Sequence, residues 1–314
     1  MEIYFDFLKV DKSRGTAITL GNFDGFHLGH QEIVGKTLTV ARNAGLSALV
    51  ITFHPHPRQL FSADLAVLTP LEKKIAYLRA AGIDQLLVQP FTREFAATDP
   101  QDFVQEYLIA GLNCRYVIVG YDYSFGAAGA GDTKLMRQLS NAAGIGCDIV
   151  APVTWNDETI SSTAVRKCLS LGQMEKAAKF MGRFFSLEGR VEVGAGRGGT
   201  LGFPTANIYP HRAAALPAWG VYLVGILLAG EAHWGVANIG CHPTFPDNRV
   251  SLEVHILEYQ GNLYGALLEI SFLTKLRDER QFSDVASLQA QVKEDIQQAI
   301  ALLSAGDVLK LQRI

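Results

Sequence analysis

TAITLGNFDGFHLGHQEIVGKTLTVARNAGLSALVITF, residues 16–53, holds two short apolar runs separated by a longer helical stretch. The runs at 16–23 and 46–53 have the length and composition of buried strands, and residues 28–45 have the length of a helix. Two buried strands joined by a helix form a βαβ unit, which places the strands parallel in one sheet. This stretch therefore predicts an α/β domain.

The same alternation continues to residue 153. Helical patterns occupy 69–82, 99–112 and 131–144, and short apolar runs occupy 83–90, 115–120 and 147–153. Two helix starts have chemical signals: Thr69-Pro70-Leu71-Glu72 offers a capping hydroxyl, a proline and a reciprocal acid, and Asp99-Pro100 repeats the cap and proline. We expect a Rossmann-like parallel sheet with helices on both faces.

The pattern changes after a helical stretch at 161–182. Residues 184–196, 220–240 and 251–273 alternate strand patterns with glycine-rich turns, and one amphipathic helix follows at 284–304. Closely spaced strands without helices between them predict a small antiparallel β-barrel. We therefore expect two domains, residues 1–182 and 183–314.

Composition narrows the class of protein. The chain of 314 residues is 48% hydrophobic and 19% charged, with a net charge of −3. No Lys/Arg-rich segment is present, so we expect no nucleic-acid partner, and no apolar run reaches the ~20 residues of a membrane-spanning helix. The scattered Cys114, Cys147, Cys168 and Cys241 form no CxxC pair, which fits buried free thiols in a reducing compartment. We expect a cytoplasmic protein.

His27 and His30 follow a glycine-rich bend at the expected start of a helix. Backbone N–H groups at a helix N-terminus attract anions, and residues three apart share one face of the first turn. Both imidazoles can then contact one phosphate, aligning it and neutralising charge that develops on its oxygens. The alternative is a pair of surface histidines, which spacing alone does not exclude.

Further segments favour the phosphate site. The glycine-rich loop GYDYSFGAAGAGD (120–132) follows a strand, where nucleotide sites of parallel sheets collect, and TISSTAVR (159–166) offers hydroxyls and an arginine. His54 and His56 in TFHPHP (52–57) have metal-chelating spacing, but no third ligand lies near, so we interpret them first as part of a site wall.

A second glycine-rich segment, GAGRGGTLGFPTANI (194–208), precedes a strand. Its N–H groups can surround a polyphosphate, with Arg197 adding charge, although it lacks the Gly-Lys-Ser/Thr of a P-loop. Thr205 and Asn207 alternate on an extended segment, so their oxygens point the same way and can ligate Mg²⁺. The structural alternative is a glycine-rich hairpin.

These motifs occur in the same order as in one known family, and the resemblance covers nearly the whole chain. GNFDGFHLGH, TFHPHP, GYDYSFG and ISSTAVR look like the adenylyltransferase domain of bacterial bifunctional riboflavin kinase/FAD synthetases, with His27 and His30 as the HxGH signature. LGFPTANI, GVANIGCHPTF, SLEVHI and LRDERQFSDVASLQAQVKEDI are similar to the riboflavin kinase domain. The resemblance implies ATP as co-substrate and Mg²⁺, with riboflavin, FMN and FAD as the flavin ligands.

The resemblance also implies roles for individual residues. His27, His30 and Glu253 are the implied catalytic residues, with Glu253 as the base toward the ribityl hydroxyl of the flavin. Thr205 and Asn207 are the implied metal ligands. The implied nucleotide and flavin positions are Gly21, Phe23, Asp24, Gly29, Gly120, Asp122, Ser162, Thr163 and Arg166 in the first domain, and Gly196, Arg197, Gly199, Gly202, Pro204, Thr205 and Asn207 in the second.

The chain differs from the family at positions where the family usually has basic residues. Ser124, Ala127 and Ala128 stand in the loop that often carries basic residues, and Ala164 replaces a common arginine. Two functions follow from this: a bifunctional enzyme that makes FMN and then FAD, or a riboflavin kinase with a degenerate first domain. A third, a flavin-responsive nucleic-acid-binding regulator, is disfavoured by the acidic pI. The sequence does not indicate the oligomeric state.

Aromatic residues stand near both predicted sites. An isoalloxazine ring needs flat apolar walls, and the aromatic residues available are Phe23, Tyr123, Phe125, Phe203 and Trp234. The sequence does not choose among them. His255 shares a strand face with Glu253 but receives no role.

Overall fold

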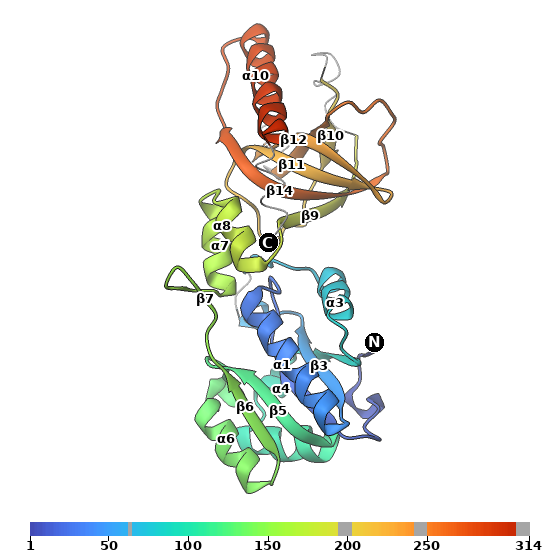
Figure 1. Ribbon diagram of the computed structural model, residues 1–314, viewed down its shortest axis with the longest axis vertical. Coiled ribbons are helices and arrows are strands. Elements are labelled where there is room, and N and C mark those ends of the chain that lie inside the picture. The colour runs from blue at the N-terminus through green and yellow to red at the C-terminus, as the bar shows by residue number, and fades with distance from the viewer. Residues whose placement is uncertain (62–64, 194–202, 242–249, 306–314) are drawn as a thin grey trace. The chain divides into compact units, whose positions relative to one another are not determined.

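The computed structural model describes residues 1–61, 65–193, 203–241 and 250–305 (Figure 1). The chain divides into two compact units, Met1–Ser162 and Thr163–Ile314. The sequence-based boundary instead follows α8 (Met174–Met181), which ends at Gly182 in a left-handed cap with φ of 67°. Since α8 packs on strands β9 (Phe185–Arg190) and β14 (Leu267–Asp278) of the second unit, the boundary at Gly182 stays a prediction.

The first unit is built on a six-stranded parallel sheet in the order β1-β4-β3-β2-β5-β6. All of its strand pairings are parallel. Its strands are β1 (Glu2–Tyr4), β2 (Thr16–Leu20), β3 (Ser47–His54), β4 (Gln85–Pro90), β5 (Cys114–Gly120) and β6 (Gly146–Val150). The parallel sheet predicted from the βαβ pattern is confirmed.

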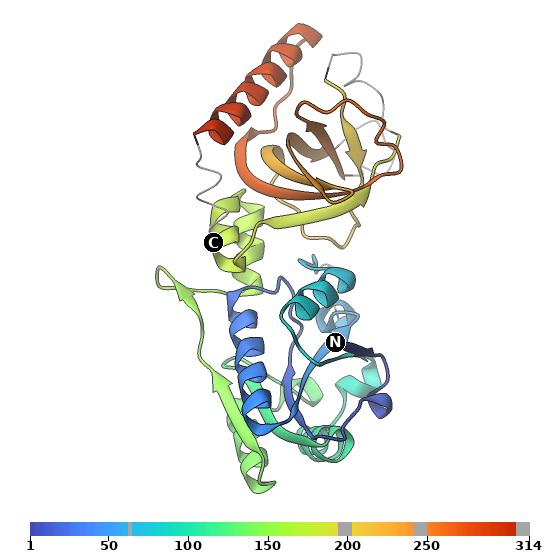
Figure 2. The same cartoon turned by 45° about the vertical axis from the view of Figure 1, so that its right-hand side comes forward.

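Helices cover both faces of this sheet, because its central strands are apolar on both sides. Val50 and Leu86 face α1 (Leu28–Ala44) and α3 (Leu71–Ala80) in a cluster that includes Val34 and Leu78. Ile51 and Leu87 face the opposite side, where the π-helical segment η2 (Phe103–Gly111) and α6 (Thr133–Ala142) pack. Figure 2 shows α1 running along its face of the sheet.

Short elements join these layers. They are η1 (Phe7–Lys9), α2 (Pro57–Phe61), α4 (Arg93–Ala96), α5 (Pro100–Asp102), η3 (Ala127–Gly129), β7 (Thr154–Trp155) and β8 (Glu158–Thr159). The cap and proline predicted at Asp99-Pro100 are confirmed, since the Asp99 carboxylate accepts from the Gln101 N–H at 2.7 Å. The cap predicted at Thr69 is wrong: α3 begins at Leu71 with Pro70 before it, and the Thr69 hydroxyl is engaged elsewhere.

The second unit contains α7 (Ser162–Ser170) from Thr163 onward, α8 and an antiparallel sheet of order β10-β13-β12-β11-β14-β9. The strands not yet given are β10 (Ala206–Ile208), β11 (Gly220–Leu228), β12 (Glu231–Cys241) and β13 (Val250–Ile256). A bridge between Glu192 and Asn207 joins the chain after β9 to β10, with the Glu192 N–H bonded to the Asn207 carbonyl at 2.9 Å. The two edges of the sheet thus meet, as a barrel requires.

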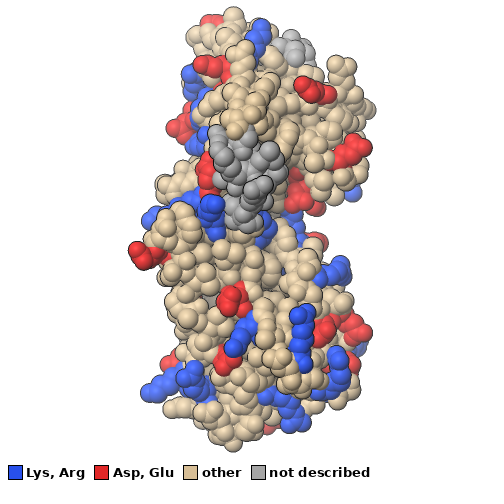
Figure 3. Space-filling model, in the orientation of Figure 1, with Lys and Arg blue, Asp and Glu red and all other residues tan. Residues whose placement is uncertain are grey.

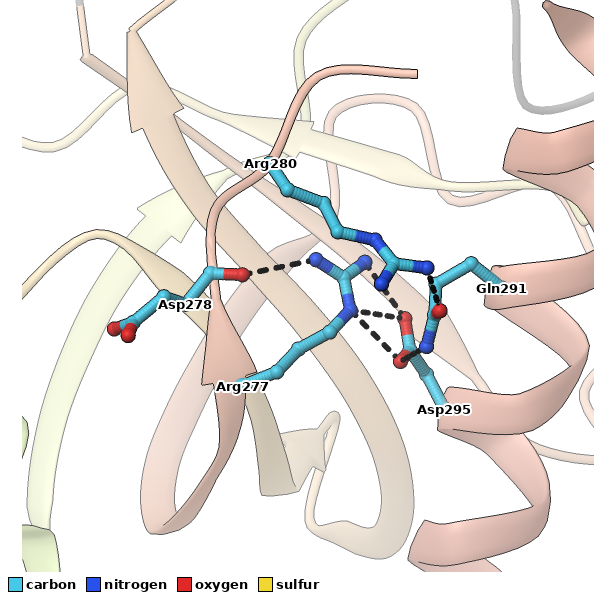
Figure 4. A network of polar contacts seen from close by, with 5 residues as sticks. All are labelled: Arg277, Asp278, Arg280, Gln291 and Asp295. Carbon is cyan, nitrogen blue, oxygen red and sulfur yellow. Dashed lines mark hydrogen bonds and ion pairs between the residues drawn. The ribbon is translucent and has the colours of Figure 1, made fainter. Parts of the chain in front are cut away.

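The C-terminal helix α10 (Val285–Ser304) packs on the outer face of the curled sheet. Ile296 and Ala299 meet Val221 and Leu273 in one apolar cluster. Beside it the Arg277 guanidinium donates to both oxygens of the Asp295 carboxylate at 2.9 to 3.1 Å (Figure 4). Gln291 donates to Asp295 at 2.8 Å and accepts from Arg280. This charge-assisted network attaches α10 to β14.

Charged side chains are interspersed over the face shown in Figure 3, with basic and acidic groups side by side. None of the helices in the described part of the chain has the length and apolar character that crossing a bilayer requires. Cys114, Cys147 and Cys168 are free thiols, as predicted, and burial raises the pKa of Cys114 to about 12. The side chain of Cys241 lies outside the described residues.

Candidate active sites

The glycines that end β2 and β5 lie at neighbouring strand ends. Thr19 is opposite Ile118 in the parallel register of these strands, so Gly21 and Gly120 leave the sheet at the same edge. The strand order continues to β3 on one side of this pair and to β6 on the other. The chain therefore reverses its direction of winding between β2 and β5, and nucleotides bind at such a switch point.

The turn after β2 has an unusual backbone. Its φ angles are 47° at Phe23, 85° at Gly25 and 35° at Phe26. A non-glycine residue in this region costs about 1–3 kcal/mol and persists only where surrounding contacts hold it. A Cβ on Gly25 would lie 2.8 Å from the Leu68 side chain, so the turn also requires glycine for space.

Asp24 supplies the contacts that hold the turn. Its side chain is buried and accepts from the backbone N–H groups of Leu68 at 3.2 Å and Thr69 at 2.9 Å. The Thr69 hydroxyl in turn accepts from the Gly25 N–H at 3.1 Å. The segment before α3 is thereby fastened to the segment before α1. Asp24 supports the shape of the turn through both of its oxygens.

His27 and His30 lie together at the start of α1. Their rings stack with centroids 3.7 Å apart, and the Phe23 ring meets His30 edge-on at 5.2 Å. A Cβ on Gly29 would come 3.2 Å from the His27 ring, so glycine lets the imidazole lie over the first turn. Helix α1 begins at Leu28, as predicted. The arrangement gives two imidazoles beside the backbone N–H groups of a helix start, which suits a phosphate.

Ser162 reaches the same turn. Its hydroxyl donates to the Asp24 carbonyl at 2.8 Å, which joins Ser162 to the turn within the first unit. Thr163 and Arg166 follow on α7 and belong to the second unit. Their predicted contacts with the nucleotide stay predictions.

The loop after β5 lies against α1. A Cβ on Gly120 would come 3.2 Å from Ile33 of α1 and 3.3 Å from Asp122 Oδ1, so Gly120 permits a close approach of helix and loop. Asp122 is exposed. Phe125 and Gly131 form an antiparallel bridge that closes the loop, and Ala128 within it has φ of 53°. The predicted Gly120 and Asp122 therefore stand at the same strand ends as Gly21.

Aromatic side chains gather behind this loop. Tyr123 stacks on Phe125 with centroids 5.9 Å apart, and Phe125 meets Phe103 at 5.7 Å. Burial raises the pKa of the Tyr123 phenol well above its usual value, so the hydroxyl stays neutral. The Tyr107 phenol donates to Gln89 at 2.5 Å. Tyr123 and Phe125 pack in the apolar core. Their additional role as a wall for the flavin stays a prediction.

His54 and His56 lie at the connection between β3 and α2. His54 is the last residue of β3, and α2 begins three residues later at Pro57. His56 Nδ1 accepts from the Arg58 N–H at 3.1 Å, so His56 caps this short helix. Groups of three or more potential metal-binding side chains were not found among the described residues.

In the second unit three polar residues stand in a row across the sheet. Glu253 of β13 is paired with Asn207 of β10 on one side and with Asn238 of β12 on the other. Directly paired residues of antiparallel strands project from the same face, so all three side chains share it. Val236, two residues before Asn238, packs in the cluster under α10, which identifies the face as the outer one. Glu253 and Asn207 thus lie side by side, and their catalytic and metal-binding roles stay predictions.

His255 positions the segment that enters β10. Its Nδ1 lies 2.9 Å from the Pro204 carbonyl oxygen, and its ring meets Phe203 edge-on at 5.9 Å. The carbonyl only accepts, so Nδ1 carries the proton in this contact. Thr205 follows directly, and its carbonyl lies 3.5 Å from the Asn207 amide nitrogen. His255, given no role from the sequence, therefore orients the Pro204–Asn207 segment.

Four predicted phosphate-binding residues, Gly196, Arg197, Gly199 and Gly202, lie outside the described residues. Three residues that the sequence reasoning missed belong to the sites: Thr69 and Lys74 beneath the first turn, and Asn238 in the polar row. Strand alternation indicates which residues share the face of Asn238, but only the register places it beside Glu253. Lys74 precedes the buried Leu78 by four residues, a helical spacing that indicates burial.

Comparison with known families accounts for both units. A FAD synthetase family model matches residues 9–164, and a riboflavin kinase family model matches residues 181–303. A solved structure described as a macrolide-efflux protein from Streptococcus pneumoniae has a TM-score of 0.86 and 28% identity, covering 94% of this chain and 97% of that one. A solved structure thus resembles this chain over both of its domains.

Curated relatives match this chain over about nine tenths of their length. The chain is 37% identical over 296 residues to a bifunctional riboflavin kinase/FMN adenylyltransferase of Bacillus subtilis, covering 92% of this chain and 93% of the relative. The relative with the same name from Escherichia coli K12 is 38% identical over 286 residues, covering 90% of each chain. The chain belongs to the bifunctional riboflavin kinase/FMN adenylyltransferase family.

Proposed function

We propose that the two reactions of this bifunctional enzyme are divided between the two polar sites described above. Riboflavin is phosphorylated by ATP to FMN and ADP in the second domain, and FMN reacts with a second ATP in the first domain to give FAD and diphosphate. The single observation that carries the division is that each family model covers one of the two sites: Asn22–His30 in one, and Asn207 with Glu253 in the other.

In the first domain, a phosphate oxygen of FMN attacks the α-phosphorus of ATP while the bond to the β-phosphate breaks, and diphosphate leaves. No side chain has to form a bond. The stacked His27 and His30, with the N–H groups of the α1 start, hold the phosphates and offset the charge that develops on their oxygens. The turn held by Asp24 fixes where these groups stand.

In the second domain, Glu253 accepts the proton of the ribityl 5′-hydroxyl as that oxygen attacks the γ-phosphorus. The bond to the β-phosphate oxygen breaks and ADP leaves. The Asn207 amide lies beside Glu253 in the register and Thr205 lies two residues before Asn207, a neutral oxygen set that fits Mg²⁺ carried by ATP phosphates. Mg²⁺ held there would screen the phosphate charge that repels the attacking oxygen.

The alternative of a kinase with an inactive first domain rests on Ser124, Ala127, Ala128 and Ala164. The match to the FAD synthetase model extends over the whole first domain, and the relatives are named for both activities, which favours the bifunctional function. The intact turn at Asp24 and the stacked histidines support the same conclusion.

Two incubations test this function. Purified chain with riboflavin, ATP and Mg²⁺ should give FMN and then FAD, separated by chromatography, and omission of Mg²⁺ should stop both reactions. Purified chain with FMN, ATP and Mg²⁺ should give FAD alone. Formation of FMN without FAD in the first incubation, together with no FAD in the second, would show that the first domain is inactive.

The partners proposed for this chain are small molecules, and we propose the cytoplasm as its location. The free thiols of Cys114, Cys147 and Cys168 support a reducing compartment. Tight binding of RNA or DNA at low salt would instead support the regulator considered from the sequence. We assign no oligomeric state.

A further inference from the structure

Asn238 is a polar residue on an otherwise apolar stretch of strand. It lies in β12, a central strand of the barrel between β13 and β11. The side chains two and four residues before it on the same face, Val236 and Trp234, pack in the apolar cluster under α10. Asparagine is depleted in strands, and a partly buried amide is costly unless it is hydrogen-bonded. Residues that break such a local rule are expected at functional sites.

The amide of Asn238 is available to a ligand. The residue is half-buried, and its side chain forms no hydrogen bond with another residue of the described part of the chain. A carboxamide offers one acceptor oxygen and two donor hydrogens. Across the sheet the row continues to Val221, which is buried under α10, and to Arg277, which is bound to Asp295. Asn238 is therefore the point beside Glu253 at which this row can hold a hydroxyl group.

The chemistry of the transfer sets the direction in which the alcohol extends. In the proposed kinase site, Asn207 holds the metal and phosphates of ATP, and Glu253 on the neighbouring strand receives the proton of the hydroxyl. The attacking and leaving oxygens are roughly in line through the phosphorus, so the carbon chain of the alcohol leads away from ATP. Across the sheet, the direction away from Asn207 leads from Glu253 to Asn238.

The spacing of Glu253 and Asn238 fits two neighbouring hydroxyl groups. Directly paired residues of antiparallel strands have Cβ atoms about 4.5–5.5 Å apart, and their side chains leave the same face. The 5′- and 4′-hydroxyls of the ribityl chain are on adjacent carbons, so a carboxylate and an amide on paired residues can each receive one of them.

We propose that Asn238 is a specificity-determining residue of the kinase site: its amide hydrogen-bonds the 4′-hydroxyl of riboflavin while Glu253 receives the proton of the 5′-hydroxyl. An alcohol without the 4′-hydroxyl would cover the amide and leave it unpaired, which is the cost that makes such a site selective. This inference rests on the proposed placement of the kinase reaction at Asn207 and Glu253.

The test compares two substrates that differ by one hydroxyl group, with the full chain and MgATP. The unmodified chain should phosphorylate 4′-deoxyriboflavin with a kcat/KM roughly tenfold below that for riboflavin. Asn238→Leu should lower kcat/KM for riboflavin by a similar factor and leave that for 4′-deoxyriboflavin within about twofold of the unmodified chain. Retained activity on 4′-deoxyriboflavin also reports that the barrel of the variant is folded. Equal losses on both substrates, or no loss on either, would overturn the inference.

A second substrate and a second variant serve as matched controls. 2′-Deoxyriboflavin lacks a hydroxyl farther from the reacting oxygen, so Asn238→Leu should lower its kcat/KM as much as that for riboflavin. Asn262→Ala, at an exposed asparagine in the segment before β14, should leave the preference for riboflavin over 4′-deoxyriboflavin unchanged. A loss of this preference in Asn262→Ala as well would show that the preference does not depend on Asn238, and would contradict the proposal.

Glu253→Gln distinguishes this inference from the function on which it rests. Suppressed FMN formation in Glu253→Gln, together with equal losses on the two substrates in Asn238→Leu, removes only the role of Asn238. Normal FMN formation in Glu253→Gln removes the proposed kinase site itself, and the role of Asn238 with it.

Discussion

Glu253 of β13 and Asn207 of β10 are direct partners in the antiparallel register, so their side chains leave the barrel on the same face. A residue able to accept a proton thus stands beside a residue able to hold a phosphate-bound metal. The same level of the sheet continues to Asn238 on β12. The proposed base and the proposed metal ligand are therefore brought side by side by the backbone register of β10 and β13.

Glu253→Gln should lower the rate of FMN formation by roughly 10²–10⁴-fold, because the amide cannot accept the hydroxyl proton. Conversion of FMN to FAD should be unaffected. Both rates are measured by chromatography on one preparation. An equal loss of both reactions would contradict the division of activities between the domains.

His30→Ala should lower FAD formation by about a hundredfold or more, since it removes a donor to the phosphates and the ring that stacks on His27. Riboflavin phosphorylation should continue at its normal rate. Steady-state kinetics with FMN as the flavin measure the effect. A rate within twofold of the unmodified chain would place the phosphates elsewhere.

His255→Phe keeps a ring of similar shape but loses the hydrogen bond to the Pro204 carbonyl. One hydrogen bond contributes about 1 kcal/mol, so the KM for MgATP in the kinase reaction should rise by roughly fivefold. His233→Phe, on a neighbouring strand, is the control. If His255→Phe and His233→Phe behave alike, His255 does not orient the segment.

Asp295→Leu should destabilise the barrel by about 3 kcal/mol, because it leaves the Arg277 guanidinium without its carboxylate in a partly buried position. Arg277→Met combined with Asp295→Leu should cost less than the two single changes together. Urea unfolding of the full chain, followed through loss of kinase activity, measures both. Asp278→Asn, at an exposed ion pair with Lys275, should leave the midpoint unchanged.

The folding stability of the first domain should rise at alkaline pH, because the buried Lys74 titrates there. Burial lowers the pKa of Lys74 from 10.5 to about 8 despite Asp24, so the unfolded chain binds more protons in this interval and folding stability rises through it, by up to about 3 kcal/mol. The contribution is lost as the pH falls through 8. The difference in unfolding free energy between the unmodified chain and Lys74→Met isolates it. A difference that does not change between about pH 8 and pH 10.5, the two pKa values of Lys74, would exclude a titrating Lys74.

The fold was largely predictable because its signals are local and periodic. Buried strands such as β3 and β5 read as apolar runs, and Leu28 begins a helix where the glycine-rich bend ends. The family motifs then placed the histidines and Glu253 in their elements. These local patterns do not show which residues, distant in the sequence, a side chain contacts in the fold.

Thr69 shows this limit. Its position before Pro70 is a typical cap signal, yet its hydroxyl bonds the Gly25 N–H, 44 residues earlier in the chain. Lys74 shows it again: its spacing from Leu78 indicates the buried face of α3, but its contact with the Thr52 hydroxyl, 22 residues earlier in the chain, is not contained in that spacing. His255 bonds a carbonyl 51 residues away. In each case the role of the side chain depends on a tertiary contact that local sequence patterns do not show.

The left-handed backbone at Phe23 and Phe26 has a consequence for engineering. Both side chains are almost fully buried, so Gly or Asn at either position would relieve the backbone but leave a cavity that costs about 3–5 kcal/mol, more than the roughly 1–3 kcal/mol of strain. A selection for heat tolerance alone should therefore retain both phenylalanines. The ring of Phe23 that meets His30 would then be kept even in descendants that are never selected for FAD.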